Sequence, residues 1–264
     1  MKRLTAVTLV AIAVLTYHAS AQNQLPASNP QAVAYGAQSI AAMTGNTAIS
    51  DLTLTGTATW YGGGTDTGTA TLRALGTGES RMDLVLSSGT RTETRDAQTG
   101  VPLGQWINPD STSGLFAFQN CQTDAVWFFP ALGSLAAGSN VVLFYIGQET
   151  RNGEAVQHIQ SYVYQPNLPP GISAQQLSSM DFYLDATTLL PVVVTFNTYP
   201  DNGSMTNLPV EVDFSNYQSQ RGVVLPMHIQ RYSQGNLLLD VSVTAAAFNT
   251  GLSLSAFTVS QPQH

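Results

Sequence analysis

Alternation of apolar and polar residues with a period of two dominates this chain and predicts β-strands. Residues 51–60 show it clearly: Leu52, Leu54, Ala58 and Trp60 occupy even positions, and threonine occupies the odd positions from 53 to 59. Such a strand buries one face and solvates the other. Similar runs follow at 69–75 and 81–87, and a wholly polar strand-like run follows at 90–96. The turns between them are too short for crossovers, so we expect consecutive antiparallel hairpins.

The last third of the chain repeats strand and turn four times, with turn sequences at 185–188, 200–203, 219–222 and 233–236. In each strand every second residue is apolar. Strand by strand, these residues are Leu190, Val192, Val194 and Phe196; Val210, Val212 and Phe214; Val223, Leu225, Met227 and Ile229; and Leu237, Leu239, Val241 and Val243. An antiparallel meander with one continuous apolar face is the simplest structure that buries them.

Residues 28–46 break this period and predict a helix. Asn29 is a suitable N-cap, Pro30 suits the first helical position, and Gly45 or Asn46 ends the helix. A narrow apolar stripe predicts that the helix lies on another element, and its members are Val33, Ala37, Ile40 and either Met43 or Ala41.

A second interruption, at 120–138, is rich in aromatic residues. Thr123 or Asp124 is a possible cap for a helix that carries Trp127, Phe128, Phe129 and Leu132, and Pro130 either kinks this helix or begins it. The proline-rich segment 165–179 is interpreted as an internal loop with one helical turn, because the strand pattern continues beyond it.

The first residues have the pattern of a secretory signal peptide. Lys2 and Arg3 precede an apolar run at 4–15, and Ala19-Ser20-Ala21 fits a signal-peptidase site. The run is shorter than the ~20 residues that span a bilayer. We expect cleavage after Ala21, export to the periplasm or the medium, no membrane span, and one domain over 22–264.

Charge narrows the possible partners. The chain has a net charge of −7, and removing 1–21 leaves 9 − 2 = 7 basic residues, all arginine, against 16 acidic ones. Such an acidic protein repels phosphate backbones and anionic membrane surfaces, so nucleic acid is not an expected partner. Cys121 is the only cysteine, and is either a buried small apolar residue or a free thiol.

Catalytic patterns are weak. The histidines outside the leader are His158, His228 and His264; no Gly-x-Ser-x-Gly motif accompanies them, and the parity of His158 and His228 predicts solvent-facing positions. No metal-ligand spacing occurs, and we expect no cofactor. The carboxylate pairs Asp83 with Glu93, and Glu211 with Asp213, would be needed for a glycan hydrolase, but the second pair lies on the solvent parity of its strand. A non-enzymatic protein is therefore favoured.

The segment 90–96 alternates threonine with Arg91, Glu93 and Arg95 and has no apolar parity. It is either an edge strand protected by charge or a polar rim that meets a ligand head group. A slip of one residue in the preceding turn exchanges the two faces, so both interpretations stay open. Arg221 and Arg231, near the ends of the strand around 223–231, are interpreted as solvating charges.

The order of elements resembles the periplasmic lipoprotein-carrier superfamily, the LolA, LolB and LppX-like proteins. Trp106-Ile107-Asn108-Pro109, after Asp96 and a glycine-containing turn, is similar to a motif of that family, as are the step from Gly222 to Pro226 and a terminal Phe257. Three features depart from the pattern: the spacing from Asp96 to Trp106 is long, no basic cluster is available for an anionic partner, and Arg81 aligns only loosely with the arginine that closes the carrier's lid.

The resemblance implies an incomplete barrel: one large curved antiparallel sheet of about eleven strands, with an N-terminal helix and a mid-chain helical lid over a cavity for acyl chains. Burial of apolar area would then bind the chains without a charged contact. Such a concave apolar face makes either a cavity or a filled core. The residues expected to line the cavity are Leu54, Trp60, Leu84, Trp106, Trp127, Phe128, Phe129, Leu132, Val194, Phe196, Val212, Phe214, Leu225 and Met227. Arg81, Arg91 and Arg95 are the expected polar rim.

The leading hypothesis is an exported carrier that binds a lipid or the acyl chains of a lipidated protein. The alternative is an interaction or sensor protein with the same fold and a packed core, which docks a partner chain on its edges. A large apolar cavity would favour the first hypothesis, and a filled core with an exposed aromatic patch would favour the second.

Overall fold

The computed structural model describes residues 25–98, 102–123, 126–133, 135–136, 138, 140–166, 168, 172–203 and 206–259. The expected leader with its cleavage site, the candidate cap Asp124 and His264 lie outside these residues. Within the described part of the chain, no helix has the length and apolar character needed to cross a membrane.

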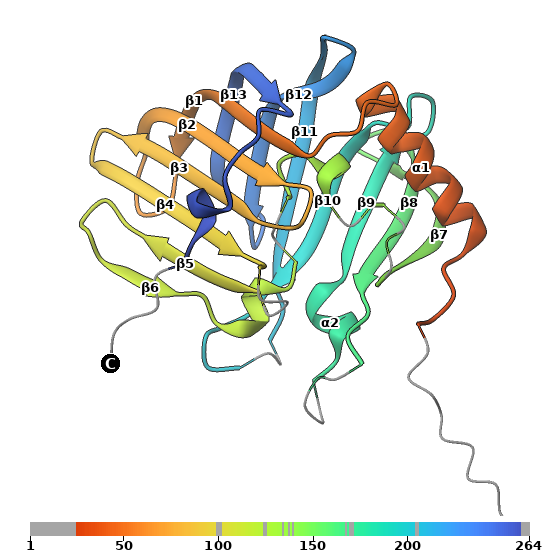
Figure 1. Cartoon of the computed structure of the whole chain (residues 1–264), viewed down its shortest axis with the longest axis horizontal. Helices are drawn as coiled ribbons and strands as arrows, with labels where there is room; N and C mark the ends of the chain where they lie inside the picture. Colours follow the sequence, from red (N-terminus) through yellow and green to blue (C-terminus); the bar gives the residue numbers. More distant parts are fainter. Residues whose placement is uncertain are drawn as a thin grey trace, which may run out of the picture.

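In the described residues, thirteen antiparallel strands form one sheet that is not closed, in the order β6-β5-β4-β3-β2-β1-β13-β12-β11-β10-β9-β8-β7 (Figure 1). Their bounds are β1 Asp51–Trp60, β2 Asp66–Leu75, β3 Ser80–Leu86, β4 Gly89–Asp96, β5 Leu103–Ile107, β6 Ser113–Leu115, β7 Val141–Arg151, β8 Glu154–Val163, β9 Met180–Asp185, β10 Pro191–Thr198, β11 Leu208–Gln220, β12 Val223–Ser233 and β13 Asn236–Phe248. The predicted class, a large antiparallel sheet with an N-terminal helix, is confirmed.

Chain order and sheet order differ at one place, where β1 pairs with β13. The strands before the mid-chain interruption and those after it therefore form two meanders joined along one seam. Tight turns fix the register within the second meander: Asn152-Gly153, Arg221-Gly222 and Gln234-Gly235 have positive φ at both residues, as two-residue hairpins require.

Helix α1, Pro30–Thr44, begins and ends as predicted. The side chain of Asn29 accepts hydrogen bonds from the backbone of Gln31 and Ala32, and Gly45 ends the helix in a left-handed conformation with φ 57°. Of the expected stripe, Val33, Ile40 and Met43 pack against the core, whereas Ala37 is exposed. The fully buried residues of the helix are Ala32, Gly36, Ser39, Met43 and Thr44. Small residues on this face let the helix approach β7, β8 and β12 closely.

The aromatic interruption is not the expected α-helix. Its described residues form two 3₁₀ turns, η1 Phe118–Cys121 and η2 Pro130–Leu132, and Pro130 begins the second turn rather than kinking a helix. The short helix in the middle of the chain is α2, Ala174–Ser178, in the proline-rich loop and capped by Ser173. The last turn, η3 Leu254–Phe257, follows β13 on the outer face of the sheet.

The core lies between the inner face of the sheet, α1 and the interruption. Val126, Trp127, Phe128, Phe129 and Leu135 are buried in one cluster with the inner-face residues of the strands. The interruption therefore covers the sheet with aromatic side chains instead of a regular helix.

The outer face carries polar side chains, and Asp213 on β11 is the most perturbed of them. Burial, then the neighbouring carboxylate of Glu211, raise the pKa of Asp213 to about 6, although Arg151 opposes the shift. Its Oδ1 atom is buried without a hydrogen-bond partner among the described residues. The ionised form of Asp213 is thus poorly stabilised in the folded protein.

We predict that Gly36→Ala destabilises the protein. A Cβ atom at Gly36 would lie 2.6 Å from the backbone oxygen of Leu135, so one of the two segments must move. Overpacking should outweigh the gain in helix propensity of ~1 kcal/mol and lower the free energy of unfolding by about 1 kcal/mol. Chemical denaturation measures this change, with Gln38→Ala on the exposed side of α1 as the control. Equal or greater stability of Gly36→Ala would contradict the close contact.

We predict that Asp213→Asn stabilises the protein at pH 7 but not at pH 3.5. A raised pKa means that the folded state binds more protons than the unfolded state between pH 4 and 6, so the contribution of Asp213 to stability falls as pH rises through this window. The shift of two pH units is worth ~3 kcal/mol, and solvent screening at this half-buried position reduces the expected gain to about 1–2 kcal/mol. Denaturation at both pH values measures it. A difference between the two proteins that does not depend on pH would contradict the prediction.

Candidate functional site

A cavity of about 510 Å³ opens at one end of the inner face, a volume within the ~300–1,000 Å³ range of small-molecule sites. Strands β3, β4 and β5 form one wall, the ends of β10 to β13 form the opposite wall, and the aromatic interruption separates the cavity from the core. The lining residues are Ser80, Met82, Arg91, Glu93, Thr94, Arg95, Gly104, Trp106, Asn108, Phe116, Asn120, Trp127, Phe128, Thr198, Tyr199, Asp201, Val210, Arg231, Ser233 and Leu238.

The register of β4 directs its charged residues into this cavity. A two-residue turn, Ser87-Ser88, joins β3 to β4, and the carboxylate of Asp66 accepts hydrogen bonds from both backbone N–H groups at 3.0 and 3.2 Å. Arg91 then pairs with the buried Leu84 of β3 and shares its face. Because β4 lies between β3 and β5, the edge-strand interpretation is wrong.

Arg91 is held by an aromatic ring and by two polar groups. Its guanidinium carbon lies 4.2 Å from the ring centroid of Trp60. One terminal nitrogen donates to Asn108 Oδ1 at 2.6 Å, and the other donates to Glu93 Oε1 at 3.2 Å. Its Nε atom is buried and has no hydrogen-bond partner among the described residues. The guanidinium is therefore fixed in position while one donor stays unused.

Arg231 reaches the same carboxylate from the opposite wall. It donates to Glu93 Oε2 at 3.3 Å, and its guanidinium carbon lies 5.1 Å from the ring centroid of Trp127. Only 8% of the residue is exposed, so the expectation of a solvating charge at this position is wrong. The sequence does contain evidence for the buried position: Arg231 has the same parity as the apolar residues Leu225, Met227 and Ile229, so it lies on the same face of β12.

The three tryptophans of the chain gather at this end of the inner face. Trp106 and Trp127 line the cavity, and Trp127 meets Phe128 edge to face with ring centroids 5.5 Å apart. Trp60 is half-buried beneath Arg91 and donates from Nε1 to the backbone oxygen of Gly62 at 3.0 Å. The aromatic surface and the arginines thus form one mixed site.

The predicted lining residues divide into two groups. Trp106, Trp127, Phe128, Arg91 and Arg95 line the cavity, and Trp60 lies beside it under Arg91. The others are buried in the packed core, next to the cavity but outside its wall: Leu54, Leu84, Phe129, Leu132, Val194, Phe196, Val212, Phe214, Leu225 and Met227. The sequence carries no periodic signal for Phe116 and Tyr199, which reach the cavity from loops, or for Asn120, which reaches it from η1.

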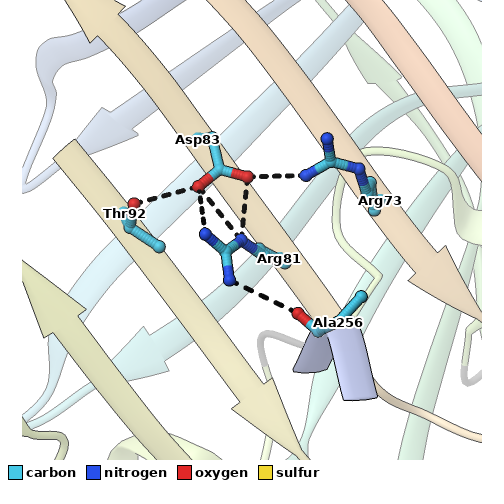
Figure 2. Close-up of polar contacts among 5 residues, drawn as sticks. All are labelled: Arg73, Arg81, Asp83, Thr92 and Ala256. Carbon is cyan, nitrogen blue, oxygen red and sulfur yellow. Dashed lines mark hydrogen bonds and ion pairs between the residues drawn. The ribbon is translucent and has the colours of Figure 1, made fainter. Parts of the chain in front are cut away.

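Arg81 points away from the cavity. On the outer face its Nε donates to Asp83 Oδ2 and its Nη2 donates to Asp83 Oδ1, both at 2.8 Å, while Nη1 donates to the backbone oxygen of Ala256 at 3.4 Å (Figure 2). Burial by itself would raise the pKa of Asp83, but Arg81, Thr92 and Arg73 together hold this pKa below its usual value. Arg81 therefore stabilises the contact between the sheet and the C-terminal segment, and it is not part of the rim.

Ser215, His228 and Asp240 form a Ser-His-Asp row across β11, β12 and β13 on the outer face. Ser215 Oγ lies 3.2 Å from His228 Nδ1, and His228 Nε2 lies 3.0 Å from Asp240 Oδ1. A hydrolase also needs donors for an oxyanion and a cleft that orients substrate. This row lies on a strand surface, and neither of the two described pockets includes it. The geometry does not support acyl-transfer chemistry there.

The other candidate chemical groups do not converge on one site among the described residues. His158 lies between Glu149 and Asp181, at 2.6 and 2.8 Å, on the outer face. Asp83 and Glu93 point to opposite faces of the sheet, so they cannot act on one glycosidic bond. Cys121 is buried. The described residues contain no group of three or more histidine, cysteine or acidic side chains that could hold a metal ion.

This chain is similar to known proteins in its three-dimensional structure but not detectably in its sequence. No family model matches the sequence, and no curated protein matches it. A domain from Vibrio parahaemolyticus, described as an outer membrane lipoprotein-sorting protein domain, superposes with a TM-score of 0.53 at 14% identity, over 87% of this chain and 97% of that one.

Two further solved structures are similar. A LolA superfamily protein from Nitrosomonas europaea has a TM-score of 0.52 at 9% identity, over 86% of this chain and 97% of that one. A DUF1329 family protein from Desulfovibrio piger has a TM-score of 0.51 at 12% identity, with the same coverage of 86% and 97%. At these identities the likeness establishes fold alone. It confirms the resemblance found in the sequence: the chain has a LolA-like fold.

Proposed function

We propose that this chain is an exported, non-enzymatic protein that binds a hydrophobic ligand, a lipid or the acyl chain of a lipidated protein, and carries it in the cavity. The observation that carries the proposal is the 510 Å³ cavity on the inner face of a LolA-like sheet, lined by Trp106, Trp127 and Phe128. Export rests on the leader pattern in residues 1–21.

Burial of an alkyl chain supplies the driving force. Each CH₂ group removed from water contributes about 0.8 kcal/mol, so ten of them provide ~8 kcal/mol before the costs of association. The aromatic rings offer flat apolar surface that is already fixed by packing, which limits the entropy lost on binding. The fold of the lipoprotein-sorting domain and of the LolA superfamily protein supports this class of ligand.

The alternative is an interaction protein with a packed interior. The observation that favours it is the filled core, since ten of the predicted lining residues are buried there. Exposed apolar residues also lie near the β5–β6 edge, namely Ile107, Leu115 and Phe118. The cavity argues for the carrier, and a binding experiment separates the two functions.

We predict that delipidated protein retains lipid after incubation with a bacterial lipid extract. Native mass spectrometry should show a bound adduct. The emission of the three tryptophans should change on binding, because two of them line the cavity and the third lies beside it. An unchanged mass and unchanged emission at saturating lipid would favour the interaction protein.

We predict that Trp106→Ala weakens the binding of dodecanol about tenfold, because most of the ~1.5–3 kcal/mol of apolar contact from one large side chain is lost. The emission of Trp127 still reports binding in this variant. Tyr61→Ala, an aromatic truncation at an exposed residue outside the cavity, is the matched control. Equal affinity of Trp106→Ala and Tyr61→Ala would place the ligand elsewhere.

A further inference from the structure

The cavity on the inner face is small for a lipid with two alkyl chains. Its volume is about 510 Å³. A water molecule occupies ~30 Å³ in the liquid, and a methylene group needs about the same space, so the cavity has room for about 17 such groups. One alkyl chain of about sixteen carbons would fill this volume, and two such chains need roughly twice as much.

The rest of the inner face offers no space for a second chain among the described residues. The ten predicted lining residues outside the cavity wall are buried in the core, and the most exposed of them, Leu132, is 8% exposed. Helix α1 packs so closely there that a Cβ atom at Gly36 would lie 2.6 Å from the backbone oxygen of Leu135. A packed interior leaves few voids larger than one water molecule. A second alkyl chain would have to displace core side chains, and the lost packing opposes this.

A second pocket, at the turns that end the hairpins, does not extend the apolar surface. Its wall includes the glycines at 62–64, the carboxylate of Asp66 and the serine turn 87–88. Arg91 and Asn108 line both spaces, so their hydrogen bond of 2.6 Å lies at the boundary. An alkyl chain laid across these groups would remove water from them without offering a hydrogen bond in return.

The cavity wall itself has an apolar part and a polar part. Trp106, Trp127 and Phe128 supply flat apolar surface. The hydroxyl-bearing residues Thr198 and Ser233 belong to the same wall. The wall therefore suits one amphiphile, whose alkyl chain lies on the aromatic surface and whose polar linkage lies beside the hydroxyl groups.

From this volume and packing we propose that the cavity takes one alkyl chain of about sixteen carbons or fewer, and that its ligand is a monoacyl lipid rather than a lipid or lipoprotein with two or three chains. The proposal rests on the proposed function, whose ligand it narrows. The limit on chain length is a property of the cavity, so it can be tested separately from binding itself.

The first test varies the chain length and keeps the head group constant. Lysophosphatidylcholines from octanoyl to octadecanoyl are titrated below their micelle concentrations into the delipidated protein, and tryptophan emission gives the affinities. Each added CH₂ group should tighten binding about fourfold until the cavity is full. The gain should stop between the dodecanoyl and hexadecanoyl ligands, because the ester linkage also needs space.

The second test varies the number of chains. Didecanoyl phosphatidylcholine and decanoyl lysophosphatidylcholine share a head group and a chain length, and both dissolve as monomers. The two should bind within about thirtyfold of each other, because the second chain finds little room. A site for two chains would bind the didecanoyl lipid more than a thousandfold more tightly, since each further buried CH₂ group contributes about fourfold.

Variants that change the cavity volume should move the limit in opposite directions. Phe116→Ala enlarges the cavity and should move the limit to longer chains by about two carbons or more, whereas Ser233→Leu should shorten it by about as much. Phe118→Ala and Ser219→Leu, at exposed residues outside the cavity wall, are the matched controls and should leave the limit unchanged. Cooperative thermal unfolding shows that each variant is folded.

The outcomes separate this proposal from the proposed function. Affinity that keeps rising through the octadecanoyl ligand, or a didecanoyl lipid that binds more than thirtyfold more tightly than its monoacyl partner, would overturn the single-chain limit and leave the hydrophobic carrier intact. A limit that neither Phe116→Ala nor Ser233→Leu moves would place the chain outside this cavity. No binding at any chain length would overturn both proposals.

Discussion

The structure depends on one constraint: a single wide sheet has an apolar inner face that must be covered. Thirteen strands present more inner face than the fifteen residues of α1 can cover. The aromatic interruption covers the next part, and Phe128, Phe129 and Leu135 are fully buried there. Where this cover ends, the charged side chains of β4 form part of the inner face and the cavity opens. The cavity is thus the part of the inner face that neither α1 nor the aromatic interruption covers.

Strands and turns were predictable because their signals are local. Period-two alternation identified β1 and the four closing strands, and glycine at the second turn position identified the hairpins at 153, 222 and 235. The aromatic interruption was not predictable in detail, because its conformation is set by contacts with the sheet rather than by helix propensity. Its described part contains only 3₁₀ turns, which follow the surface beneath them.

The face of β4 that carries Arg91 can be derived from the sequence. A two-residue turn at 87–88 or at 88–89 joins residues of opposite parity, so Arg91 must follow the face of Leu84 and Leu86 in either case. Arg231 was equally accessible from the parity of β12. The contact between Glu93 and Arg231 was not accessible, since it joins residues 138 positions apart through the curvature of the whole sheet.

Charge on the two faces of the sheet has different consequences. On the outer face Asp83 is paired with two arginines and one hydroxyl, and its lowered pKa means that the fold stabilises the ionised form. On the inner face Arg91 and Arg231 each bind one oxygen of Glu93, and all three side chains have low exposure. An apolar inner face at these positions would cost the fold less, as at the equivalent positions of β2 and β3. The charged side chains lie beside the tryptophans, so the inner face ends in a mixed aromatic and polar cavity wall rather than in packed core.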